Sequence, residues 1–160
     1  MGKRVKILPL CLLLAALLCL PGCGGQSKAA APADMQAVYA EIQKQVELPE
    51  MMQLSEKRMS SYYGIEADEC AQAVLMVSEA GLRVDEIWLV EAASEDAAAH
   101  IQSVAESRIQ QLCAETESYS AELYAVASAG RVLREGVQVA LFISPEAETM
   151  ASIFQNAVGK

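Results

Sequence analysis

The chain has 160 residues, enough for one folded domain and not for two of ordinary size. It carries 21 acidic and 12 basic residues, a net charge of −9. This excess of negative charge opposes nucleic-acid binding, which depends on neutralising phosphates, and opposes a purely electrostatic hold on anionic lipid, so we expect no nucleic-acid partner.

The first 22 residues differ in composition from the rest of the chain. Lys3, Arg4 and Lys6 are basic with no acid beside them, and residues 7–20 are apolar. As a helix this apolar run rises about 21 Å, less than the roughly 30 Å hydrocarbon core of a bilayer. We therefore predict a signal peptide over 1–22 and not a permanent membrane span. Without it, nine basic and 21 acidic residues remain, a net charge of −12.

The predicted leader ends in Leu20-Pro21-Gly22-Cys23. An aliphatic residue at −3 and a small residue before cysteine resemble the lipobox of bacterial lipoproteins, although proline at −2 is a departure. The resemblance implies diacylglyceryl transfer to Cys23, cleavage before it, and anchoring on the outer face of the cell membrane through palmitate-type acyl chains. Residues 23–33 then predict the acylated cysteine and a flexible tether. The alternative is a secreted protein in which the cysteine is incidental.

The mature domain, residues 34–160, is expected to begin with two helices. Asp34 caps the first, whose apolar stripe ends before Pro49. The second is short, beginning at Ser55 and stopping at Gly64.

Two strand-like runs follow, residues 71–77 and 85–90, with a loop near 79–84 that indicates a hairpin. The second run alternates imperfectly between apolar and polar positions. Ser94 then caps a long helix that has two acids in its first turn, where the helix dipole favours them.

The segment 120–129 fits two interpretations. Ser120 could cap a short helix that ends at Gly130, or the same residues could open a strand. The helix is the favoured interpretation.

A second hairpin is predicted from residues 131–134 and 137–143. Leu141 and Ile143 share the inward face of its second strand. A last helix is expected to begin at Ser144, because a capping side chain followed by proline is a strong start signal.

These elements predict an α+β fold. Two ββα units in series, preceded by the two N-terminal helices, suggest an antiparallel sheet with helices packed on one face.

One set of residues is similar to a known family. Together with the lipobox, its members are Tyr63-Gly64-Ile65, Asp85-Glu86-Ile87, the long helix ending near Tyr119, Gly136 and Phe154. They resemble an uncharacterised family of small lipoproteins from Gram-positive Firmicutes, a domain of unknown function, over residues 34–158. The resemblance implies a tethered domain, and it transfers no catalytic residue.

The polar residues form no familiar catalytic pattern. His100 lacks a partner on its own helix, so we expect a solvated or half-buried histidine. Cys70 and Cys113 are either two small buried thiols, the favoured interpretation, or a disulfide. No CxxC pair indicates a metal.

Acidic and aromatic residues also favour ordinary structural roles. We expect solvated surface charge, and not a Ca²⁺ site, from the acids at positions 66, 68, 69, 85 and 86. Trp88 and the Tyr62-Tyr63 pair are expected to pack in the core or at a helix end. The sequence therefore predicts no catalytic, cofactor-binding or metal-binding residue, and one lipidated residue, Cys23.

Three functions compete on this basis. The leading hypothesis is a non-enzymatic module that binds an envelope protein, peptide or small ligand beside the membrane. The main alternative is an envelope hydrolase or transferase that uses surface carboxylates. A third is a structural or assembly-helper module.

Overall fold

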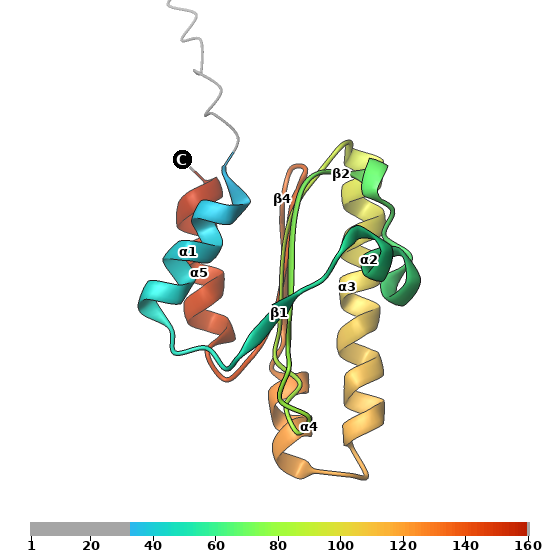
Figure 1. Ribbon diagram of the computed structural model, residues 1–160, viewed down its shortest axis with the longest axis vertical. Coiled ribbons are helices and arrows are strands. Elements are labelled where there is room, and N and C mark those ends of the chain that lie inside the picture. The colour runs from blue at the N-terminus through green and yellow to red at the C-terminus, as the bar shows by residue number, and fades with distance from the viewer. Residues whose placement is uncertain (1–32, 160) are drawn as a thin grey trace, which may run out of the picture. The chain divides into compact units, whose positions relative to one another are not determined.

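A computed structural model describes residues 33–159 (Figure 1). The predicted leader, Cys23 and the tether up to residue 32 lie outside the described residues. The elements, in chain order, are α1 (Met35–Gln45), β1 (Met51–Gln53), α2 (Glu56–Tyr63), the 3-10 helix η1 (Ala67–Glu69), β2 (Cys70–Ser78), β3 (Glu86–Ala92), α3 (Glu95–Thr116), α4 (Ala121–Ser128), β4 (Arg131–Glu135), β5 (Gln138–Ile143) and α5 (Ala147–Val158).

The five strands form one antiparallel sheet in the order β1-β2-β3-β5-β4. Both predicted hairpins are confirmed, β2 with β3 and β4 with β5. The central strand is β3, where Trp88 lies between Leu75 of β2 and Leu141 of β5. The short strand β1 was not predicted, because three residues are too few to show a period of two.

Helices cover both faces of the sheet, so the prediction of helices on one face was wrong. Figure 1 shows α1 and α5 on one side of the sheet, α2 and α3 on the other, and α4 at one end of the strands. The buried Ala127 of α4 belongs to the core on the α3 side. The reason lies in β3: Ile87 and Leu89 pack toward α1 and α5, whereas Trp88 and Val90 pack toward α3. A strand that is apolar on both sides is typical of a sheet buried between two helical layers.

The segment 120–129 is helical, as favoured. The Oγ of Ser120 accepts a hydrogen bond from the Leu123 amide at 3.3 Å, which caps α4. Gly130 follows, and a Cβ placed there would lie 3.0 Å from the Ile109 side chain. The chain after α4 therefore approaches α3 closely, and a side chain at position 130 would press against both Ile109 and the Ala127 carbonyl.

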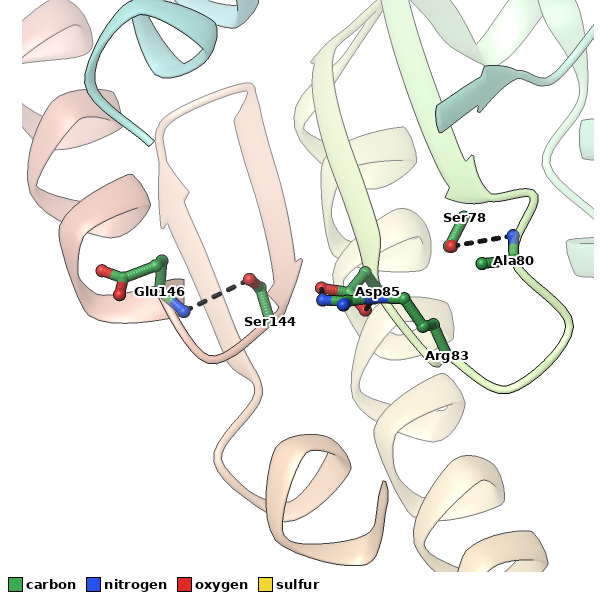
Figure 2. Close-up of polar contacts among 6 residues, drawn as sticks. All are labelled: Ser78, Ala80, Arg83, Asp85, Ser144 and Glu146. Atoms are coloured by element: carbon green, nitrogen blue, oxygen red, sulfur yellow. Dashed lines mark hydrogen bonds and ion pairs between the residues drawn. The ribbon is translucent and has the colours of Figure 1, made fainter. Parts of the chain in front are cut away.

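The last helix begins later than predicted. Ser144 was expected to cap it, but Glu146 is the N-cap and the helix begins at Ala147. Ser144 instead closes a turn: its Oγ accepts from the Glu146 amide at 3.2 Å (Figure 2), and its carbonyl accepts from the Ala147 amide at 3.2 Å. Its hydrogen bonds thus serve the turn that leads out of β5.

Three connections meet at one end of the sheet. They are the loop between β2 and β3, the turn between α3 and α4, and the turn between β5 and α5. Residues from all three line the same hollow. We call this region the loop end, and it holds the candidate site.

Candidate functional site

An ion pair lies at the loop end, where the β2–β3 loop enters β3. The Nε and Nη2 of Arg83 lie 2.8 and 3.1 Å from the two carboxylate oxygens of Asp85, as Figure 2 shows. The Asp85 side chain is 6% exposed, whereas the Arg83 side chain is 44% exposed. Hydrogen bonding to Asp85 and the negative charges of Asp85 and Glu122 raise the pKa of Arg83. The loop is thus held to the strand by a two-point contact with one oxygen for each nitrogen.

The next residue, Glu86, belongs to a second network on the α3 face of the sheet. Its Oε1 accepts from Nε and Nη2 of Arg108 at 2.9 and 2.5 Å, and its Oε2 accepts from the Tyr63 hydroxyl at 3.2 Å. The Tyr63 ring lies 4.4 Å from the Trp88 ring between centroids. Burial, followed by the negative charge of Glu86, raises the pKa of Tyr63.

Arg108 stays charged in this half-buried place because Glu86 compensates it. Burial alone would lower the pKa of Arg108, but the hydrogen bonds and charge of Glu86 outweigh it and the pKa is raised. The network therefore joins α2, α3 and β3 through one carboxylate.

The prediction that Asp85 and Glu86 are solvated surface charges was wrong. The two residues are 5% and 4% exposed. The other acids of that set do lie near the surface: those at positions 66 and 68 are exposed and Glu69 is half-buried. Burial of an acid is tolerated where a cation and hydrogen bonds accompany it, and each buried acid here has an arginine.

A hollow of about 530 Å³, with a mixed polar and apolar lining, opens beside the Arg83–Asp85 pair. Its rim carries two large exposed side chains, Leu82 of the β2–β3 loop at 70% and Tyr119 of the α3–α4 turn at 69%. Leu123 and Val126 of α4 also line it. We call it the Leu82–Tyr119 hollow. Sequence reasoning missed it, although a large apolar residue in a polar loop was a usable signal at both rim positions.

A second hollow of similar volume, about 540 Å³, lies between α1 and α5. Its lining mixes polar residues, such as Ser152 and Asn156, with apolar ones, such as Val38 and Ile153, and those two apolar side chains are buried. Large exposed apolar side chains are what distinguish the Leu82–Tyr119 hollow from it.

His100 is exposed on α3, as expected, but it has a partner on another element that the sequence did not indicate. Its Nδ1 lies 2.7 Å from Oε1 of Glu69, which η1 supplies from 31 positions earlier. The backbone amide of Glu66 lowers the pKa of Glu69, and the hydrogen bond from His100 lowers it further. Among residues 33–159, no group of three or more His, Cys, Asp or Glu side chains is arranged to hold a metal ion. The hydrogen bond between Glu69 and His100 ties η1 to the start of α3.

Cys70 and Cys113 are free thiols in the structure, and both are half-buried. Burial raises the pKa of Cys70 to about 11, and the charges of Glu69 and Asp68 add to the rise. Because the thiolate is the nucleophile, this environment lowers the reactivity of Cys70.

The sequence profile of one family, described as a domain of unknown function (DUF4358), matches residues 44–144. The chain belongs to this family. No curated protein and no solved structure is significantly similar to the chain.

The DUF4358 match runs from the end of α1 to the turn after β5. It therefore contains all five strands, both buried ion pairs and both rim residues of the Leu82–Tyr119 hollow. Within the described part of this DUF4358 chain, no helix has the length and apolar character needed to cross a membrane.

Proposed function

We propose that this DUF4358 chain is an extracytoplasmic lipoprotein that binds a polypeptide partner of the cell envelope and catalyses no reaction. A diacylglyceryl group on Cys23 would hold it at the membrane. The lipobox-like ending of the leader supports the anchor, and the resemblance to small lipoproteins of Gram-positive Firmicutes supports the location.

The observation that carries the binding function is the pair of rim residues. Leu82 and Tyr119 are large, mostly exposed side chains, and both line the same hollow. Burying a leucine side chain is worth about 1.5–3 kcal/mol, and aromatic side chains are common anchors in interfaces. Two such groups around a concave surface favour a docking site for a partner.

The state of the acids supports binding over catalysis. A general acid or base must reach the proton it transfers, but Asp85 and Glu86 are both buried and engaged by arginine. The exposed His100 lies beside Glu69, and the pair has no nucleophile hydrogen-bonded to it among residues 33–159. Neither of the two buried acids is therefore free to serve the alternative, an envelope hydrolase or transferase, as a general acid or base.

A site-specific cross-linking experiment tests the binding function. The full-length chain, in its own envelope, would carry a photo-reactive amino acid in place of Leu82. We expect one discrete adduct with an envelope protein or peptide. The matched control places the same amino acid at Tyr124, which is 39% exposed on α4 and does not line the hollow. Equal adducts from both positions would contradict the site.

The enzyme alternative has its own test. Turnover of peptidoglycan fragments, peptides or glycosides by the purified chain, lost in Asp85→Asn or Glu86→Gln with the fold intact, would overturn the proposal.

A further inference from the structure

We propose that the Leu82–Tyr119 hollow receives a basic segment of its partner, one that carries a large apolar residue flanked by lysine or arginine. This inference rests on the proposed binding function and names the chemistry of the partner.

The first argument is the charge of the helical wall of the hollow. From Ile109 to Gly130, through the end of α3, the turn and all of α4, the chain contains no lysine, arginine or histidine. The same stretch contains three glutamates, at positions 115, 117 and 122. Glu122 lines the hollow, and Glu117 precedes Tyr119 by two residues. The rim beside the exposed tyrosine is therefore negatively charged.

The second argument is that neither Glu117 nor Glu122 is held in an ion pair within residues 33–159, although Glu122 lies near enough to Arg83 to raise the pKa of Arg83. Both glutamates are exposed. The basic residue that lines the hollow is Arg83, and Asp85 already engages two of its nitrogens. A cation supplied by a partner would meet two free carboxylates and one exposed aromatic ring, which also attracts cations.

The third argument excludes other occupants. A second copy of the chain would bring the same acidic wall, and the mature sequence carries a net charge of −12. An anionic membrane surface would be repelled for the same reason. A basic polypeptide segment satisfies both features of the hollow, because its apolar residue can lie between Leu82 and Tyr119 while its cations reach the glutamates.

The test is a selection from a displayed library of random peptides on the full-length acylated protein in zwitterionic nanodiscs. We expect the enriched peptides to be net positive with at least one large apolar residue, and their affinity to fall as salt is added. The double variant Glu117→Lys/Glu122→Lys should bind them about tenfold or more weakly, which is on the order expected for reversing two rim charges. The control Glu106→Lys reverses an exposed acid of α3 outside the hollow and should bind normally.

The outcomes separate this inference from the proposed function. The variants Leu82→Ser and Tyr119→Ser show whether a selected peptide binds at the hollow. If peptides that these variants fail to bind are neutral or acidic, the inference of a basic segment is overturned, but the binding site is not. If no peptide is enriched but a specific cross-link forms at position 82, the basic segment is likewise overturned and the binding site is not. Peptides that bind regardless of Leu82 and Tyr119 would overturn the site itself.

Discussion

Arg108 of α3 binds one oxygen of Glu86 on β3 through two nitrogens, at 2.9 and 2.5 Å. The other oxygen of that carboxylate accepts from Tyr63 of α2. The Arg108 guanidinium also lies 5.7 Å from the centre of the Tyr63 ring. A single buried acid, Glu86, thus links the central strand to two helices. Because the Glu86 carboxylate is buried, removing the Arg108 cation should destabilise the fold.

Arg108→Ala should lower the free energy of unfolding by about 3–5 kcal/mol, because it leaves the Glu86 carboxylate buried without its cation. Denaturant unfolding measures this loss. The control is Lys44→Ala, which breaks the exposed Lys44–Glu41 pair and should cost less than about 1 kcal/mol. Similar losses in the two variants would show that the Glu86 network is not buried as described. The double variant Glu86→Leu/Arg108→Leu should recover most of the stability.

Leu141→Ala should lower the free energy of unfolding by about 2–5 kcal/mol, since the side chain is 0% exposed on the α3 face of β5. The matched control is Leu82→Ala, the same substitution at a side chain that is 70% exposed, with an expected change within about 0.5 kcal/mol. If Leu141→Ala lowers the free energy of unfolding by less than about 1 kcal/mol in a denaturant melt, the Leu141 side chain does not point into the core as described.

Stability should fall at alkaline pH, partly through Cys70. Burial, with the nearby acids, raises its pKa from the ordinary value of 9.0 to about 11 in the folded chain, so the folded state retains the neutral thiol. Its contribution is fully present below about pH 9 and is lost as pH rises toward about 11, because the unfolded chain loses its proton first.

Melting temperatures from neutral pH to about pH 11 check the role of Cys70. The variant Cys70→Ala should lose less stability over the alkaline range than the unmodified chain. Burial also raises the pKa of Tyr39 and Tyr63, so part of the decline should remain in the variant. Identical declines in the two proteins would show that Cys70 makes no contribution.

Features that depend on neighbours in the sequence were predictable. Asp34 accepts the amide of Gln36 at 2.9 Å, and Ser94 accepts the amide of Ala97 at 3.1 Å, as their positions before helical stripes indicated. Gly64 ends α2 with a φ of 68°, the left-handed conformation expected of a helix stop. Each of these interactions spans only a few residues, so local chemistry decides it.

Features that depend on distant residues were not predictable from local pattern. The bond between Glu86 and Arg108 spans 22 positions, and the bond between Glu69 and His100 spans 31. The Leu82–Tyr119 hollow exists only because separate connections meet at the loop end. The two-faced burial of β3 did leave a signal, since the imperfect alternation of that run is what burial on both sides produces.

The anchor gives the last prediction. The proposed leader places a small residue, Gly22, directly before Cys23, so we expect processing to leave Cys23 as the first residue of the mature chain with acyl chains on it. Two such chains bury many methylene groups at about 0.8 kcal/mol each, which is enough for stable membrane attachment. Cys23→Ala should therefore give an unacylated protein that keeps its leader or leaves the membrane fraction, whereas Cys70→Ala should remain membrane-bound. Mass spectrometry of the native N-terminus decides the matter. An unmodified Cys23, or cleavage at another bond, would refute the lipid anchor while leaving the Leu82–Tyr119 hollow and its partner to be tested separately.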